Sequence, residues 1–153
     1  MTLIASGSTS DPVTITNASF FPDLTLSDFR DTMRVDSTVT DERAVHALQA
    51  AMFNVNAQLA TWMQEQKDAG VTTLENVPEQ DWQPAGVYMR LYLRAVWSMA
   101  RANLVERYRD YDSTNDGHDR AEALEVTGDD YRRDAHWAIS DIRGVNRTTV
   151  ELI

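Results

Sequence analysis

The sequence predicts an all-α protein, an antiparallel bundle of about four helices with an extended N-terminal tail and a short C-terminal strand. Apolar residues recur every three or four positions in three long segments, which is typical of helices that bury one side. Glycines follow two of these segments directly, at Gly70 and Gly144, where a helix commonly ends. Polar connectors separate the segments, so we expect neighbouring helices to fold back on one another.

Length and composition fit one globular domain. The chain has 153 residues, of which 25% are charged and 42% apolar, and no apolar run approaches the length of a membrane span. We divide it into a flexible tail (1–18), a helical bundle (19–144) and a C-terminal extended segment (145–153). The N-terminal "MTLIASGSTS" lacks a basic region, so we expect no signal peptide, a soluble protein and no membrane contact.

Two short elements are expected before the first long helix. The alternation from Val13 to Thr16 predicts a strand only if another edge pairs with it. Residues 25–34 predict a short helix, with Thr25 as its N-cap and Asp28 near the positive end of the helix dipole.

The first long helix is expected from Asp41 to Ala69, capped by Thr40 and followed by Gly70. One apolar stripe runs along it. Phe53 stands off that stripe, and the pattern leaves open whether it makes a second contact or is simply an exposed apolar residue.

The second long helix is expected to start with Pro84 in its first turn and to end near Tyr111. Two apolar arcs on this helix predict packing on two sides. The remaining wedge holds Arg90, Arg94, Ser98 and Arg101. Two interpretations stay open: a solvated face paired with acids of a neighbouring helix, or a seam between subunits.

The third long helix is expected from Ala121 to Arg143, although Gly128 in its middle weakens the helix. Trp137 lies away from the apolar arc, which favours an interface, since Trp is enriched there. The ending "NRTTVELI" predicts a strand with Val150 and Leu152 on one side, suited to pairing between subunits.

Catalytic and metal-binding patterns are absent from the sequence. The three histidines lack a second ligand at helical spacing, and "DSTNDG" begins like a calcium loop but lacks the final Glu, so no metal or cofactor is expected. Cysteine is absent, and no phosphate-binding or hydrolase motif occurs. The net charge of −10 argues against gripping nucleic acid. An enzyme is therefore the weaker class.

Three separated segments carry a family resemblance: "FFPDL", "ANLVERYRDYD" and "DDYRRDAHWAISDIRG". In this order they resemble the GpL-like head completion/stabilisation proteins of temperate contractile-tailed phages, over residues 20–153. The matching positions are the turn Phe20, Phe21 and Pro22, then Glu106, Arg107, Tyr108 and Arg109, then Arg133, Asp134, Trp137 and Ala138.

The resemblance implies a non-enzymatic protein with a fold similar to phage head-tail connector proteins. It implies a ring, a dodecamer, on the portal protein at the portal vertex after DNA packaging, which retains DNA and prepares the head for tail joining. Its partners would be portal and tail or tail-completion proteins, with packaged double-stranded DNA nearby but not bound by sequence. It would be made in the bacterial host cytoplasm and reside at the head-tail junction of the virion.

The alternative is a monomeric helical adaptor or regulatory module that binds a partner protein. For the connector, we expect the subunit or portal interface to include residues from the aromatic turn, the arginine wedge, the last helix and the terminal strand. Pro22 would fix a rigid turn that docks the tail onto its own bundle or a neighbour. These residues are Phe20, Phe21, Pro22, Arg90, Arg94, Arg101, Trp137, Val150 and Leu152.

Overall fold

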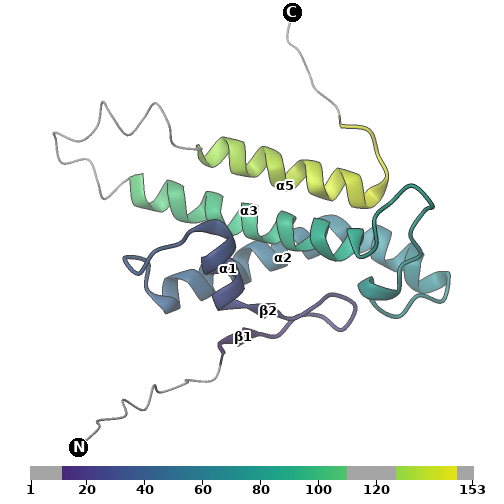
Figure 1. The fold of residues 1–153 in the computed structure, drawn as a ribbon, viewed down its shortest axis with the longest axis horizontal. Helices are drawn as coiled ribbons and strands as arrows, with labels where there is room; N and C mark the ends of the chain where they lie inside the picture. Colours follow the sequence, from purple (N-terminus) through teal and green to yellow (C-terminus); the bar gives the residue numbers. More distant parts are fainter. Residues whose placement is uncertain (1–11, 110–126, 148–153) are drawn as a thin grey trace, which may run out of the picture.

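The computed structural model describes residues 12–109 and 127–147, which form a helical bundle with one small hairpin (Figure 1). The elements are β1 (Thr14–Ile15), β2 (Leu24–Thr25), α1 (Leu26–Met33), α2 (Asp41–Asp68), a 3₁₀ turn (Leu74–Asn76), α3 (Val87–Arg109) and α5 (Gly128–Arg143). This confirms the predicted mostly helical bundle. No helix in the described ranges has the length and apolar character needed to cross a membrane.

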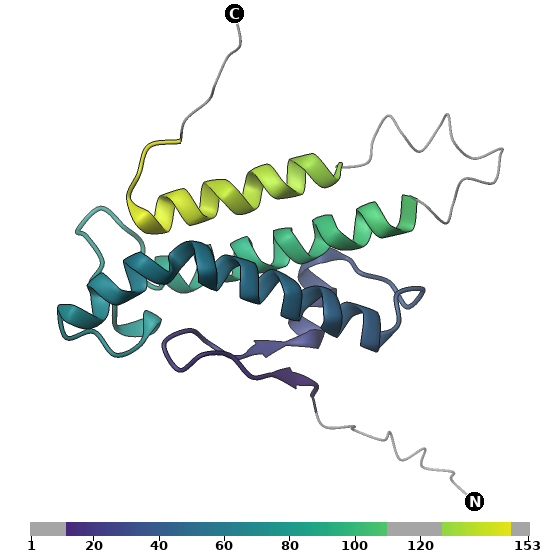
Figure 2. The ribbon, with the colours of Figure 1, turned by 180° about the vertical axis from the view of Figure 1, so that it is seen from behind.

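Helix α3 is the centre of the molecule. In Figures 1 and 2, α5 lies along one side of α3, while α2, α1 and the hairpin lie on the other. Helix α3 runs antiparallel to both α2 and α5. Its fully buried side chains include Tyr92, Ala95, Val96 and Ala102. The prediction that this helix packs on two sides is therefore confirmed.

Helix α2 follows the sequence closely. The Thr40 hydroxyl accepts a hydrogen bond from the Arg43 N–H at 3.4 Å and so caps the first turn. Leu48, Val55 and Leu59 from the predicted stripe are fully buried. Gly70, at φ +90°, turns the chain away just after the helix ends.

Helix α3 begins later than predicted. Pro84 does not lie in its first turn, because the helix begins at Val87 and Gly86 has φ +72°, a left-handed conformation that interrupts a right-handed helix. The Glu79 carboxylate accepts a hydrogen bond from the Gly86 N–H and fixes this turn. The predicted end at Tyr111 falls outside the described residues.

Helix α5 begins at Gly128, not at Ala121 as predicted. Thr127 has extended backbone angles, and its hydroxyl accepts a hydrogen bond from the Asp130 N–H while the Asp130 carboxylate accepts from the Thr127 N–H. Gly128 thus lies at the start of the helix rather than its middle. A Cβ there would lie 3.1 Å from Cγ of Glu106 on α3, so glycine permits this close approach. The predicted end at Gly144 is confirmed.

The hairpin brings part of the predicted tail into the fold. Strands β1 and β2 are antiparallel, with Thr14 opposite Thr25 and Ile15 opposite Leu24. Ile15 is buried in the core, although it lies in the segment that the sequence predicts as a tail (1–18). The predicted strand at Val13 to Thr16 does find an edge. Thr25 precedes α1 as expected, but its side chain makes no capping hydrogen bond.

Candidate interaction surfaces

The aromatic turn at Phe20 and Phe21 faces inward. Phe20 is 1% exposed and Phe21 5%, and the two rings meet edge to face with centroids 5.2 Å apart. Phe20 meets Trp62 of α2 edge-on at 6.2 Å, and Phe21 stacks on Tyr92 of α3 at 4.8 Å. Of the two docking options, the structure shows the turn docked on its own bundle. Almost no ring surface remains for another chain.

A polar triad lies beside these rings. The Asn17 side chain donates to the Tyr92 hydroxyl at 2.7 Å, that hydroxyl donates to the Asn56 side-chain oxygen at 2.7 Å, and Asn56 donates back to Asn17 at 2.8 Å. Asn17 also donates to the carbonyl of Pro22 at 2.8 Å. Burial raises the pKa of Tyr92 to about 12, partly offset by the hydrogen bond from Asn17. The triad ties the hairpin to α2 and α3.

The arginine wedge of α3 lies between the two apolar arcs of the helix. Arg94 forms an ion pair with Asp134 of α5 at 3.3 Å, with both side chains well exposed. Arg90 is exposed and its guanidinium reaches the carbonyl of Pro84 at 3.5 Å. Arg94 therefore pairs with an acid of a neighbouring helix, as in the first of the two interpretations of the wedge. Ser98, in the same wedge, is buried.

Two polar atoms of α3, one of them in this wedge, lack a hydrogen-bond partner among the described residues. They are the indole N–H of Trp97 and Nε of Arg101, both buried. Buried donors without a hydrogen bond are uncommon in native proteins and cost free energy. The wedge is thus incompletely satisfied within the described part of one chain.

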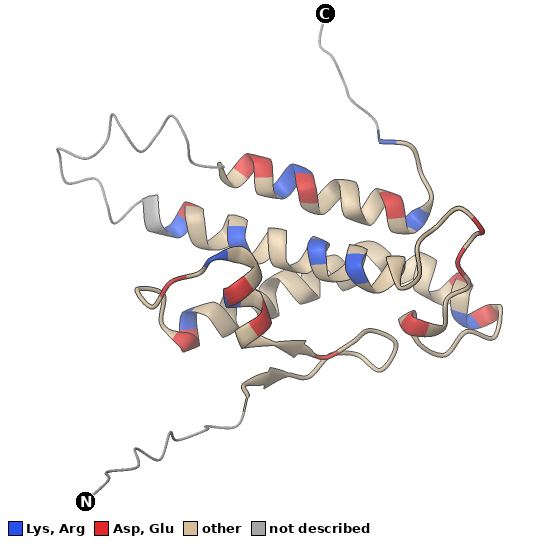
Figure 3. Cartoon of the chain, in the orientation of Figure 1, with Lys and Arg blue, Asp and Glu red and all other residues tan. Residues whose placement is uncertain are grey.

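Helix α3 is also the basic element of an acidic chain. It carries Arg90, Arg94, Arg101, Arg107 and Arg109 but only one acid, Glu106, while the whole chain has a net charge of −10. Figure 3 shows the blue positions along α3 and the red ones on α1 and at the start of α5. Helix α3 is therefore rich in basic residues, although Arg94 and Glu106 form ion pairs with Asp134 and Arg132 of α5.

Glu106 joins α3 to α5. Both terminal nitrogens of Arg132 donate hydrogen bonds to the Glu106 carboxylate. This hydrogen bonding lowers the pKa of Glu106 and, with the attraction between the charges, raises the pKa of Arg132. The pair fixes the spacing of the two helices next to Gly128.

Trp137 lies on the side of α5 away from the buried arc, as the sequence predicted. Its ring lies 5.2 Å from the Arg133 guanidinium and 5.0 Å from that of Arg147. Asp130 pairs with Arg133 at 2.8 Å and Asp141 with Arg147 at 2.5 Å. The result is a half-buried indole with cations held against it, on an outer face.

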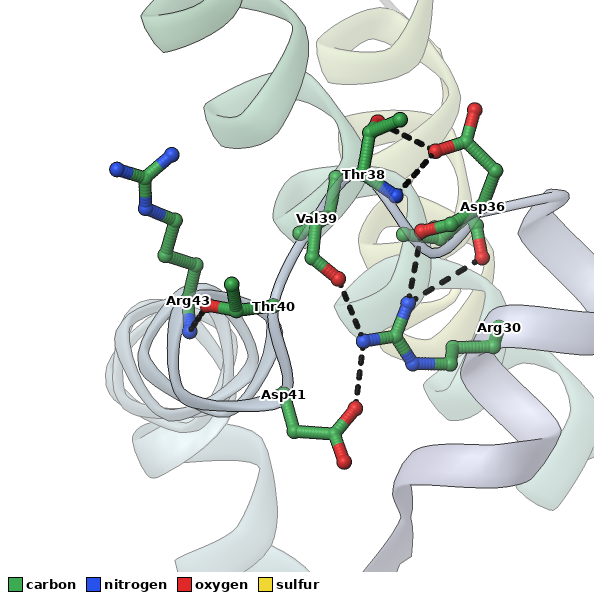
Figure 4. A network of polar contacts seen from close by, with 8 residues as sticks. Arg30, Asp36, Thr38, Val39, Thr40, Asp41 and Arg43 are labelled. Atoms are coloured by element: carbon green, nitrogen blue, oxygen red, sulfur yellow. Dashed lines mark hydrogen bonds and ion pairs between the residues drawn. The ribbon is translucent and has the colours of Figure 1, made fainter.

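The loop between α1 and α2 is held by one side chain, Arg30 (Figure 4). Its guanidinium donates to the carbonyls of Asp36 and Val39 at 3.0 and 2.7 Å and to the Asp41 carboxylate at 2.6 Å. Hydrogen bonds from Thr38 lower the pKa of Asp36, and the charges of Arg101 and Arg30 act in the same direction. The charged groups of Arg30, Asp36 and Asp41 therefore hold this loop in place.

Metal chemistry has no support in the described ranges, where no group of three or more His, Asp or Glu could hold an ion. The incomplete calcium-like loop "DSTNDG" lies outside these ranges, as do Val150 and Leu152, so the terminal strand stays a prediction.

Phe53 does not pack against the core of its own bundle. It is 77% exposed on α2, and Trp82, in the loop before α3, is 76% exposed. Neither was among the interface residues chosen from the sequence. The signal for Phe53 was present, since it stands off the buried stripe of α2.

Comparison with known proteins identifies the family. A family model described as phage head completion protein (GPL) matches residues 15–153, beginning at the buried residue of β1. A head completion/stabilization protein of Escherichia phage P2 is 36% identical over 143 residues, which are 94% of this chain and 85% of the phage P2 protein. No solved structure shows a significant match. The chain therefore belongs to the phage head completion protein (GPL) family.

Proposed function

We propose that this chain is a structural protein that completes the DNA-filled phage head. It binds the portal protein at the portal vertex as a connector ring, retains the packaged DNA and prepares the head for the tail or tail-completion proteins. The observation that carries this proposal, beside the family, is the basic wedge of α3, where Arg90 and Arg94 are exposed in a chain of net charge −10. A ring of copies places these exposed guanidinium groups at a seam between neighbours.

Exposed charges of opposite sign on different elements support head-to-tail contact. The wedge is basic, while α1 and the start of α2 carry the exposed acids Asp28, Asp31 and Glu42. When two different surfaces of one protein are complementary, contact between them repeats from copy to copy and closes into a ring if the rotation allows. Copies of this chain can thus join through the Arg wedge and an acidic surface. The dodecamer expected from connector resemblance is one such closed ring.

The overall charge suits a ring around the path of DNA. With 24 acidic against 14 basic residues, the protein repels phosphates at long range. We expect the packaged duplex to lie nearby without being bound by sequence. The Arg wedge then faces protein rather than DNA.

A non-enzymatic role agrees with the titrating groups of the described residues. Three carboxyl groups have a lowered pKa, and in each the cause is a structural contact: Thr38 for Asp36, Arg132 for Glu106 and Thr127 for Asp130. Lowered values keep the carboxylates ionised, whereas a general acid near neutral pH needs a raised one.

Charge reversal of the wedge tests the proposal. Arg90→Glu with Arg101→Glu should leave the helical circular dichroism intact and reduce the share of filled heads whose DNA is protected from nuclease. Arg143→Glu, an exposed position on α5, is the matched control and should protect DNA like the wild type. Full protection by the double variant at ordinary salt would show that the wedge is only a solvated face.

A further inference from the structure

The outer side of α2 is an exposed surface without charge. No Asp, Glu, Lys or Arg occurs between Arg43 and Glu65, although α2 is the longest described helix and a quarter of the whole chain is charged. In Figure 2, α2 lies at the front with no described element over it, and Figure 3 shows charged positions only near its ends. Depletion of charge marks the cores of protein interfaces.

This outer side carries a line of exposed residues with coiled-coil spacing, which we call the α2 seam and which is separate from the buried stripe. Starting at His46, steps of four, three, four, three and four residues lead along one line of exposed side chains. The line is opposite the buried stripe, so the bundle does not use it. Its residues are His46, Ala50, Phe53, Ala57, Ala60 and Gln64.

The seam is complementary to itself when two copies run antiparallel. A twofold axis level with Val55 places Phe53 of each copy opposite Ala57 of the other, which matches a large side chain with a small one. The same axis places Ala50 opposite Ala60 and His46 opposite Gln64. Contacts in which residue i meets j and j meets i define a closed twofold interface.

The ends of α2 are complementary in charge in the same arrangement. At about 100° per residue, Glu42 and Lys67 lie on one flank of the seam, and Arg43 and Asp68 on the other. A twofold antiparallel pair brings like flanks together, so Glu42 of each copy meets Lys67 of the other. Lys67 now has its ammonium 5.9 Å from the Phe20 ring, and its exposed side chain can reach outward.

We propose that the free protein forms a dimer through this seam, which we call the Phe53 face, with a second copy bound antiparallel along α2. The inference does not rest on the connector ring. A twofold contact closes on itself and cannot propagate, so a ring uses other surfaces, such as the Arg wedge. The Phe53 face is therefore a separate interface of the free protein.

Sedimentation equilibrium over a range of protein concentrations tests the pairing. The wild type should associate as a dimer, and Phe53→Glu should weaken the dimer at least about tenfold, as expected for a central aromatic anchor. Trp82→Glu is the matched control, because Trp82 is equally exposed but lies in the loop before α3. It should dimerise like the wild type. A monomeric wild type, or a Phe53→Glu variant that dimerises normally, overturns the proposal.

Cysteine cross-linking tests the orientation, since the chain has no cysteine of its own. Helices pack about 8–10 Å apart with Cα atoms about 2.3 Å from each axis, so facing seam positions come within disulfide reach. Ala50→Cys mixed with Ala60→Cys should form oxidised heterodimers. Each variant alone should not, because its two cysteines would lie about 15 Å apart along the helices. Efficient cross-linking of Ala50→Cys alone indicates parallel helices and contradicts the antiparallel pair, as does no cross-linking of the mixture.

Discussion

The Phe20–Phe21 pair and Phe53 are all aromatic residues outside the apolar stripes of the sequence, but the pair is buried and Phe53 is exposed. The pair occurs in "NASFFPD" and Phe53 in "AMFNVN". The pair is buried against Trp62 and Tyr92, whereas Phe53 is 77% exposed on the outside of α2. The sequence favoured the pair as interface residues and left Phe53 open.

The difference follows from how each residue is held. Phe53 belongs to a long helix, so the periodicity of its own helix places it opposite the buried stripe. Phe20 and Phe21 belong to a hairpin loop, where no periodicity applies and burial depends on a return of the chain. The β1–β2 pairing and the Asn17, Asn56 and Tyr92 triad make that return. An aromatic turn beside a tail is thus no evidence of an exposed anchor.

The largest expected effect separates the two kinds of phenylalanine. Phe20→Ala should lower the free energy of unfolding by about 3–5 kcal/mol, because it opens a cavity between Trp62 and the hairpin. Phe53→Ala should change the single chain by less than about 0.5 kcal/mol. Urea unfolding, at concentrations low enough for single chains, measures both. Equal losses in the two variants would remove the contrast.

The triad should give an intermediate effect with a pH signature. At neutral pH, Tyr92→Phe should cost about 1–3 kcal/mol, since Asn17 and Asn56 lose a buried partner. Burial raises the folded pKa of Tyr92 from 10.0 to about 12, so its protonated form stabilises the fold fully below pH 10.

As pH rises from 10 to about 12, unfolded chains ionise this tyrosine and folded ones do not, so the wild type loses up to about 3 kcal/mol relative to the variant. Unfolding of both proteins across this range should therefore show a shrinking gap. A gap that stays constant above pH 10 would mean that Tyr92 titrates freely in the fold.

The smallest effect is expected at the N-terminus. Removing residues 1–11 keeps every described contact of the hairpin, so the melting temperature should stay within about 1 °C, below the shift of about 2–4 °C that 1 kcal/mol produces in a chain of this size. Removing residues 1–16 also deletes β1 and the buried Ile15 and should lower it clearly. Differential scanning calorimetry of the two truncations compares them, and equal melting temperatures would show that the hairpin adds nothing.

Much of the helical core could be predicted, because long periodic segments report their own buried side. The bounds of α2 and the two packed sides of α3 are examples. The alternation at Val13 to Thr16 predicted the first strand of the hairpin, but its partner could not be predicted, since the two residues Leu24 and Thr25 carry no pattern. The start of α5 was hidden because its capping residues, Thr127 and Asp130, lie inside a segment that keeps the apolar spacing.

For the candidate surfaces too, positions on a helix could be predicted, whereas contacts between elements could not. The position of the Arg wedge follows from helical spacing, but its contact with Asp134 depends on how α5 packs on α3. Trp137 was correctly placed away from its buried arc, and Arg133, four residues earlier on α5, follows from helical spacing, but the approach of Arg147 from beyond the helix does not. Contacts between elements are tertiary facts, which local patterns do not contain.

Electron microscopy of DNA-filled heads tests the central claim most directly, namely that the outer surfaces of this bundle assemble it on the head. Tailless filled heads should be imaged before and after addition of the purified protein. The account predicts a new ring of density at the portal vertex with the wild type, and none with the Arg90→Glu, Arg101→Glu variant. Wild-type protein that binds elsewhere on the head, or leaves the portal vertex unchanged, would contradict it.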